Sequence, residues 1–297
     1  MLNKKNPKQN KSESRFKSES LMVWNNLKVI SISVLKNLRT YLYIFVLPMT
    51  FITAEIFYRT QGGHSEVKIA QIAGFFQISS FFIIFLVNIT ISEWKNSVFL
   101  KRIHSSGVSK TNFLISITLF NFLIGIVSFL VNFAYILILL TFVIKSTSTQ
   151  KPLVTELELM DSMGWTGVVL SLIFTLLISI FLGTIISGIF KSVSLSQTIT
   201  TFFILFSIVF SDNFLSPEVM GTVKGLAVVS YFVPYKHSIW ISYLMIANGA
   251  KDLIYPSVTT RLYLSFNLIT WLPIITSILY TTLLASGAYF TFKWNVK

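Results

Sequence analysis

Two long apolar runs are separated by the charged segment SEWKNSVFLKRIHSSGVSKT, residues 92–111. The runs before and after it, residues 69–91 and 112–144, each exceed the roughly 20 apolar residues needed to cross a bilayer core of about 30 Å. Charged side chains are costly inside such a core, so the segment is a connector at a membrane surface. The fold is therefore built from apolar helices joined by polar connectors.

The connector carries the signals of a short helix: a cap, charges that complement the helix dipole at each end, and a stop. These signals come from Ser92, Glu93, Lys101, Arg102 and Gly107. They predict a short helix over residues 93–104. Ser109 or Thr111 would then cap the next long helix, so that the short helix is held between two membrane spans.

The composition is also that of a membrane protein. The chain has 297 residues, 53% hydrophobic and only 12% charged, with a mean hydropathy of +0.71. These charges are too few to cover a soluble globule of this size. The net charge of +13 does not indicate a nucleic-acid partner, because the basic residues are concentrated in the first 39 positions and the 92–111 connector. Without cysteine, the chain forms no disulfide or zinc–thiolate site.

Six apolar stretches are long enough to span a bilayer, so we expect an all-α integral membrane protein. Within a transmembrane domain of residues 41–297, the expected spans are residues 41–58, 69–91, 112–144, 167–190, 193–210 and 262–292. Residues 1–20 are polar and basic, and we expect them to be a disordered tail. Residues 21–40 place apolar and polar side chains on opposite helical faces, which predicts an interfacial helix on the cytoplasmic leaflet.

The distribution of Lys and Arg predicts the orientation. If both termini are cytoplasmic, the basic surplus lies inside: in the amino-terminal region, the 92–111 connector, Lys191 and the carboxyl terminus. The opposite orientation would place that surplus outside, against the positive-inside rule. The abundance of Lys, Asn, Ile and Phe favours an AT-rich bacterial genome, so we expect a bacterial plasma membrane protein with cytoplasmic termini.

Residues 225–248 are apolar, but Pro234, Tyr235, Lys236 and His237 interrupt them. A seventh span would place Lys236 near mid-membrane, at about 2.5 to 3.5 kcal/mol on insertion scales. Proline also breaks a helix, because it removes a donor. We therefore expect a re-entrant helical hairpin on the external side between spans five and six, with its break at these four residues.

The 92–111 connector resembles the first cytoplasmic loop of the type-2 ABC exporter permeases. The matching positions are Glu93, Lys101, Arg102 and Ser109. The resemblance implies that the short helix is a coupling helix, which seats on a separate ATPase. The expected coupling residues are Glu93, Lys95, Phe99, Lys101 and Arg102. Among them, Lys95 and Arg102 are expected to flank Phe99 on one helical face.

The broken hairpin adds to this resemblance. Permeases of the family carry two short external helices between spans five and six, broken at a proline followed by an aromatic residue, as at Pro234 and Tyr235. The resemblance in architecture covers the chain after about residue 20. Two positions depart from the family pattern: Asn96-Ser97 stands where glycine is usual, and Gly107 where proline is usual.

The family resemblance implies the partners. Two copies of a separate ABC ATPase would bind ATP and Mg²⁺, while this chain would bind no cofactor. A second permease chain, identical or similar, would complete the membrane part. ATP-driven closure would push the coupling helices and switch the spans between inward and outward access. An apolar lining with scattered hydroxyls and amides suits export of amphipathic molecules such as drugs, lipids or peptides, although a carbohydrate path stays open.

No catalytic motif is visible. Gly62-Gly63-His64 lacks the lysine of a phosphate-binding loop. The three histidines lie in separate loops, and neither His-Glu-x-x-His nor Gly-x-Ser-x-Gly occurs. We therefore expect no catalytic or metal site, and ATP hydrolysis only by a partner.

Polar and small residues recur at helical spacing on three spans. They include Asn121, Gly125, Ser128 and Asn132 on span three, Gln197 and Thr201 on span five, and Asn267 and Thr270 on span six. Such stripes either hold helices together in lipid or line a translocation path. The sequence leaves both interpretations open.

The alternative function is a secondary transporter or channel that needs no ATPase. An inverted internal repeat would favour it. The sequence shows no such repeat.

Overall fold

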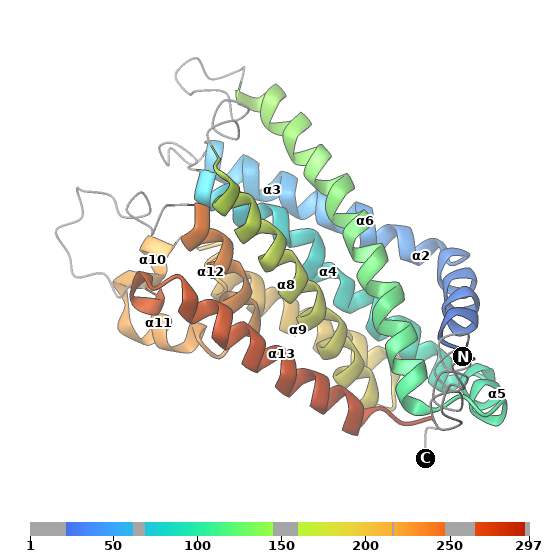
Figure 1. The fold of residues 1–297 in the computed structure, drawn as a ribbon. Helices are drawn as coiled ribbons and strands as arrows, with labels where there is room; N and C mark the ends of the chain where they lie inside the picture. Colours follow the sequence, from blue (N-terminus) through green and yellow to red (C-terminus); the bar gives the residue numbers. More distant parts are fainter. Residues whose placement is uncertain (1–21, 62–68, 145–159, 216, 247–264, 295–297) are drawn as a thin grey trace, which may run out of the picture.

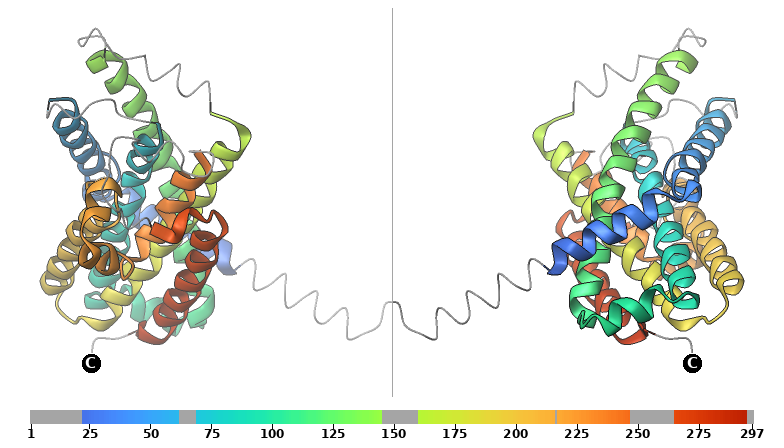
Figure 2. Two further views of the ribbon diagram at one scale, coloured as in Figure 1. Left: turned by 90° about the vertical axis from the view of Figure 1, so that its left-hand side faces the viewer. Right: turned by 90° about the vertical axis from the view of Figure 1, so that its right-hand side faces the viewer.

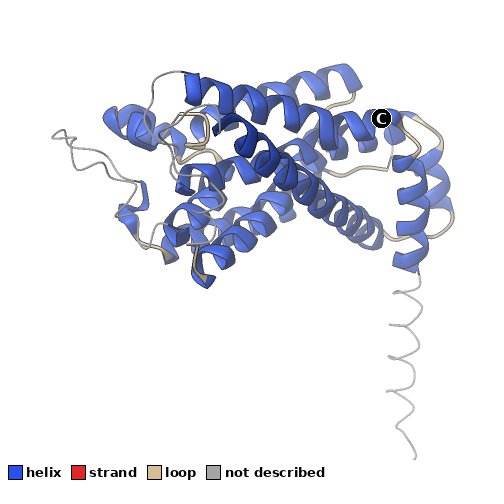
Figure 3. Ribbon diagram, turned by 90° about the horizontal axis from the view of Figure 1, so that it is seen from above, coloured by secondary structure: helices blue, strands red, loops and turns tan. Residues whose placement is uncertain are grey.

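The computed structural model describes residues 22–61, 69–144, 160–215, 217–246 and 265–294 (Figure 1). All regular structure in these ranges is helical (Figure 3). The predicted disordered tail, residues 1–20, lies outside the described residues.

Six helices are long and apolar enough to cross a membrane: Leu38–Phe57, Gly74–Asn96, Lys110–Leu139, Ser162–Ile189, Val193–Phe210 and Trp271–Thr291. The chain is therefore an all-α multi-pass membrane protein, as predicted. The first span combines α2 (Leu38–Tyr41), a π-helical turn (Leu42–Val46) and α3 (Leu47–Gln61). The others are α4 (Ile69–Asn96), α6 (Lys110–Ile144), α8 (Ser162–Ile189), α9 (Val193–Phe210) and α13 (Trp271–Thr291). Besides the amino-terminal helix Met22–Leu35, the shorter helices among the described residues include α5 (Phe99–Ser105), α10 (Pro217–Thr222), α11 (Lys224–Ser230) and α12 (Pro234–Ile246).

Helices α4 and α8 form the centre of the bundle (Figure 1). In the most apolar part of α4, 89% of the residues are buried, which leaves little of this span for lipid. Helix α8 packs against α4, α12 and α13. A Cβ at Gly183 of α8 would lie 2.9 Å from the carbonyl oxygen of Ile84, so glycine is what allows the two backbones to approach.

The bundle has two different ends. Helix α5 and the carboxyl-terminal end of α13 lie at one end, whereas α10 and α11 lie at the opposite end (Figure 1). The amino-terminal helix Met22–Leu35 is near α5 and runs across the bundle (Figure 2). Its Ile30 and Val34 are buried. The carbonyl of Val23 also accepts a hydrogen bond from the Ser116 hydroxyl of α6 at 3.3 Å.

The expected helix over residues 21–40 is shorter than predicted. It ends at Leu35, and the side chain of Asn37 accepts a hydrogen bond from the Arg39 amide at 3.1 Å. This cap starts a new helix, so the first span begins at Leu38 rather than at Tyr41.

The sixth span also differs from its prediction. Phe266, Asn267 and Leu268 have φ angles of 56°, 49° and 60°. These left-handed conformations cannot continue a right-handed helix. The helix therefore begins at Trp271 instead of near residue 262. Asn267 lies in the preceding turn and Thr270 at the helix start, so neither belongs to a stripe along the span.

Candidate functional site

The 92–111 connector folds differently from the single helix expected over residues 93–104. Helix α4 continues to Asn96, the chain turns at Ser97 and Val98, and α5 begins at Phe99. The Ser97 hydroxyl accepts a hydrogen bond from the Phe99 amide at 3.1 Å. Ser92 is inside α4 and does not cap a helix. The expected boundary was wrong because α4 gains packing partners beyond its apolar run.

The end of α5 agrees with the prediction. Gly107 has a φ of 81°, the left-handed conformation that ends a helix. The Ser109 hydroxyl then accepts a hydrogen bond from the Asn112 amide at 3.2 Å, at the start of α6. The two turns that fix the position of α5 thus come from local sequence signals.

Lys95 does not lie on an exposed face with Arg102, contrary to the sequence interpretation. It belongs to α4, its side chain is buried, and its Nζ donates to three carbonyl oxygens at the end of α8. These are the carbonyls of Ser187 at 2.6 Å, Gly188 at 3.2 Å and Phe190 at 3.4 Å. A cation at a helix carboxyl terminus neutralises the partial negative charge there. Lys95 therefore joins α4 to α8.

Glu93 also contacts another element. Its Oε1 accepts a hydrogen bond from Arg39 Nη1 at 2.8 Å, and the two side chains are 37% and 63% exposed. An ion pair this accessible contributes at most about 1 kcal/mol. It connects α4 to the start of the first span.

The cations of α5 point away from the bundle. Lys101 and Arg102 are exposed, whereas Leu100 is fully buried. The ring of Phe99 packs on Trp94, with centroids 4.6 Å apart. We call the exposed side of α5, with Lys101, Arg102 and Ser105, the α5 surface.

Aromatic contacts join α5 to the spans. The ring of His104 lies 5.1 Å from that of Trp294, just after α13. Trp294 is also 5.1 Å from Phe113 on α6, and Phe113 is 6.3 Å from Trp94 on α4. Helix α5 therefore contacts Trp94 of α4 and Trp294 after α13 directly, and both of these rings contact Phe113 of α6.

At the opposite end, α11 and α12 are separated by the turn Tyr231–Val233, so the break falls just before Pro234. The four residues expected at the break, Pro234 to His237, instead form the first turn of α12, and all are buried. Tyr235 reaches the middle of the bundle. Its hydroxyl is 2.9 Å from that of Ser179 on α8, and its ring is 4.2 Å from that of Phe81 on α4.

Lys236 forms a buried ion pair. Its Nζ lies 2.7 Å from Oδ2 of Asp212, and neither side chain has any exposed surface. Ser230 accepts a further hydrogen bond from Nζ at 2.6 Å, and Trp240 Nε1 donates to the same Asp212 oxygen at 2.5 Å. Two buried charges this close neutralise each other, which is the condition for burying either. The sequence indicates that burying Lys236 in the membrane is costly, but it does not identify Asp212 as its partner.

His237 joins α12 to α13. One ring nitrogen is 2.9 Å from the Thr276 hydroxyl, and the other is 2.9 Å from the carbonyl oxygen of Tyr231. The imidazole also packs against the tilted ring of Tyr280, with centroids 4.6 Å apart. Both ring nitrogens are therefore occupied by structural contacts.

The polar stripe of α6 holds helices together. Ser128 and Asn132 are buried and donate to the carbonyl oxygen of Ile44 at 2.7 and 3.2 Å. Ile44 lies in the π-helical turn, where the helical hydrogen-bond pattern changes. Gly125 lies directly against Leu176 of α8, while Asn121 donates within its own helix to Ile117 at 2.8 Å. Most of this stripe therefore serves packing inside the chain.

The polar residues of α9 divide between two faces. Gln197 is half-buried and Thr201 is exposed. The buried line consists instead of Ser196, Thr200 and Ser207. Asn88 of α4 donates to the Ser196 hydroxyl at 2.7 Å. The sequence analysis did not select this buried line.

Among the described residues, no three His, Cys, Asp or Glu side chains are grouped so as to hold a metal ion. The arrangement offers two features for function: the cationic α5 surface at one end and the buried, broken helix pair at the other.

Compared with protein-family models and with curated proteins, the chain matches none of them. The class of protein is therefore assigned from the fold alone: an all-α multi-pass membrane protein.

Proposed function

We propose that this chain is the permease subunit of a bacterial ABC exporter, and that two copies of a separate ATPase bind at the α5 surface. The observation that supports this most is the two-sided character of α5. Lys101 and Arg102 face outward, while Leu100 is fully buried on the other side. A partner protein can bind the outer side of such a short helix while Leu100 stays buried against the spans.

The contacts beneath α5 suit force transmission. Phe99 packs on Trp94 of α4, and His104 packs on Trp294 after α13. Packed interiors resist compression, so a displacement of α5 would be passed on to these spans. ATP hydrolysed by the partner would thus change the relative positions of the spans. ATP and Mg²⁺ would be bound by the ATPase.

In this proposal the α5 end faces the cytoplasm of a bacterial cell, together with both chain termini. Arg102, Lys191 and Lys293 are exposed cations near the ends of spans on this side, which agrees with the positive-inside rule. The α11–α12 pair would then be a re-entrant hairpin that enters from the external side. The Tyr235 hydroxyl at the start of α12 reaches Ser179, in the middle of α8.

A second permease chain would complete the path. Gln197 and Thr201 are not fully buried, and the neighbouring Phe202 is 70% exposed. Mixed polar and aromatic side chains on this face of α9 suit a surface shared with a second copy, which would enclose an amphipathic substrate such as a drug, lipid or peptide.

The decisive test exchanges one charge on the α5 surface. The ATPase that co-purifies with the chain is reconstituted with wild-type protein, Arg102→Glu or the control Lys191→Glu, which reverses another exposed cation. Like-charge contacts across an interface cost several kcal/mol. We expect Arg102→Glu to lower ATP-driven transport about tenfold or more. Normal transport by Arg102→Glu contradicts the proposal. Transport by the chain without any ATPase supports a secondary transporter or channel instead.

The proposed orientation has its own test. The chain contains no cysteine, so Ser105→Cys and Lys224→Cys each introduce a single thiol at an exposed position. An impermeant thiol reagent added to intact cells should label position 224 and spare position 105. The reverse result would overturn the orientation.

A further inference from the structure

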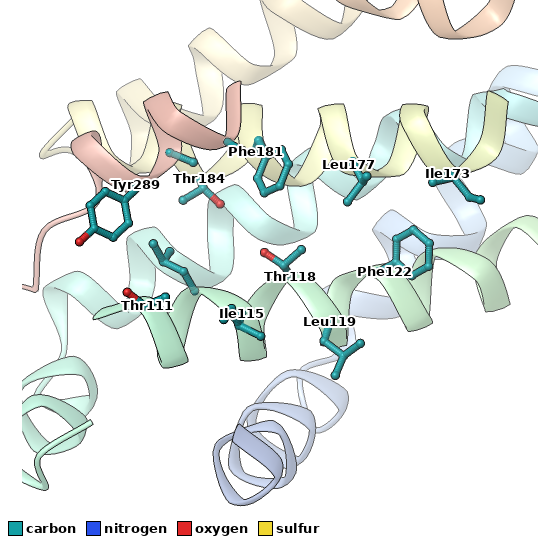
Figure 4. A pocket seen from close by; sticks show the side chains of 13 residues that line it. Thr111, Ile115, Thr118, Leu119, Phe122, Ile173, Leu177, Phe181, Thr184 and Tyr289 are labelled. Atoms are coloured by element: carbon teal, nitrogen blue, oxygen red, sulfur yellow. The ribbon is translucent and has the colours of Figure 1, made fainter. Parts of the chain in front are cut away.

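A groove of about 480 Å³ lies between α6, α8 and α13 (Figure 4). Thr118, Leu119 and Phe122 line it from α6, Leu177 and Phe181 from α8, and Tyr289 from α13. It lies outside the α5 surface and the α11–α12 pair, so the proposed function does not account for it.

The length of the groove matches one leaflet of a bilayer. Along α6 it extends from Thr111 to Phe122, and along α8 from Ile173 to Thr184. Eleven residue steps of helix cover about 16 Å, which is roughly half of a hydrocarbon core of about 30 Å. An extended acyl chain of a single leaflet has the same direction and depth.

The lining suits an apolar occupant. Its surface is almost entirely apolar, and the buried Thr184 hydroxyl is satisfied by donating to the carbonyl oxygen of Ile180 at 2.8 Å. Ile115 and Leu119 at the edge are 49% and 40% exposed, so the groove opens laterally from the bundle. A polar molecule would lose its hydration here without gaining hydrogen bonds.

One end of the groove is positively charged. Lys110 immediately precedes the lining residue Thr111, and its Nζ lies 4.6 Å from the ring centroid of Tyr289, another lining residue. This contact holds the Lys110 ammonium group at the end of the groove that lies towards α5. A phosphate placed there would form a charge-assisted hydrogen bond with Lys110.

We propose that this groove binds one anionic membrane phospholipid, with an acyl chain along α6 and α8 and the headgroup phosphate at Lys110. The apolar length and the terminal cation match the two parts of such a lipid. A second copy of this chain fits less well, because its identical surface would bring another lysine towards Lys110. The site needs no ATPase, so it can be tested independently of the transport proposal.

The test measures which lipid the purified chain retains. Wild-type protein is equilibrated with an equimolar mixture of phosphatidylglycerol and phosphatidylcholine in detergent, and bound lipids are counted by native mass spectrometry. We expect one tightly retained phosphatidylglycerol per chain. Ala285→Trp, which fills the groove from α13, should reduce retention about tenfold. Lys110→Gln should remove the preference for phosphatidylglycerol, a loss of about fivefold.

Matched variants control for general effects. Leu283→Trp adds the same ring at a position of α13 that is 60% exposed and outside the groove lining, and Lys191→Gln removes another exposed cation. Both should retain lipid as the wild type does. Equal retention by Ala285→Trp, or an undiminished lipid preference in Lys110→Gln, would overturn the proposal.

A second measurement uses only the wild-type chain and so does not depend on the variants folding. Phosphatidylglycerol with a photoreactive acyl chain is cross-linked to the protein in nanodiscs, and the labelled peptides are identified. Labels within residues 111–122 and 173–184 are expected. Labels found only on other spans would exclude the lipid site.

Discussion

The exposed cations of α5 and the buried Lys236 near the opposite end of the bundle have opposite environments. At the α5 end, Lys101 and Arg102 are exposed and do not support the fold. At the opposite end, Lys236 has no exposed surface and is held by Asp212, Ser230 and the rings around it. Solvated charges are free for a partner, whereas desolvated charges must already be paired. Substitutions at the α5 surface should therefore affect function, and those at the buried pair stability.

The largest effect on stability should come from Asp212→Ala. It leaves the Lys236 ammonium buried without its counter-charge, which costs about 3 to 5 kcal/mol. The midpoint of thermal unfolding in detergent should fall markedly, and the yield of folded protein with it.

A matched double variant distinguishes the lost pair from a general defect. In Asp212→Asn combined with Lys236→Met both charges are removed, and much of the lost stability should return. If Asp212→Ala unfolds at the wild-type temperature, the ion pair is not what fixes α12 in the bundle.

A smaller loss is expected for Lys95→Met. The variant keeps an apolar stem but leaves the carbonyls of Ser187, Gly188 and Phe190 without their common donor. Unsatisfied buried acceptors cost about 1 to 3 kcal/mol. Thermal unfolding measures the loss, with Lys101→Met as the exposed control. Equal stability of the two variants would show that Lys95 is not structural.

The next largest loss of stability is expected from changes at the π-helical turn. Ser128→Ala and Asn132→Ala together remove both side-chain donors to the Ile44 carbonyl. Interhelical hydrogen bonds in membrane proteins average about 0.6 kcal/mol each, so the double variant should lose roughly 1 kcal/mol. Ser286→Ala, which removes an exposed hydroxyl on α13, provides the comparison. A double variant as stable as Ser286→Ala would mean that the carbonyl is satisfied in another way.

The smallest change in stability should follow Arg102→Glu. An exposed substitution usually stays within about 0.5 kcal/mol. The unfolding temperature should equal that of the wild type even though transport is expected to fall about tenfold or more. A large drop in stability would show that Arg102 stabilises the fold. The contrast between the exposed cations of α5 and the buried Lys236 would then lose its support.

Much of the fold follows from local patterns in the sequence. Apolar length predicted all six long helices, and the bounds of the span at residues 193–210 agree with the structure. Gly107 and Ser109 ended and began helices as expected, because a stop or a cap depends only on residues within one turn. Pro234 marked the break between two helices for the same reason.

The remaining features depend on distant partners. Lys95 could not be recognised as a cap of α8, because its acceptors lie 92 or more residues away. The pairing of Asp212 with Lys236 likewise depends on how α12 enters the bundle. On α9 the sequence interpretation selected Gln197 and Thr201, one position from the buried Ser196 and Thr200. Lipid and protein interior are both apolar, so hydropathy alone cannot choose between adjacent helical faces.

Trp294 has a practical consequence for any fusion protein. Its ring lies 5.1 Å from that of His104 on α5. A bulky fluorescent protein joined directly after Trp294 would therefore lie next to α5 and compete with whatever docks there.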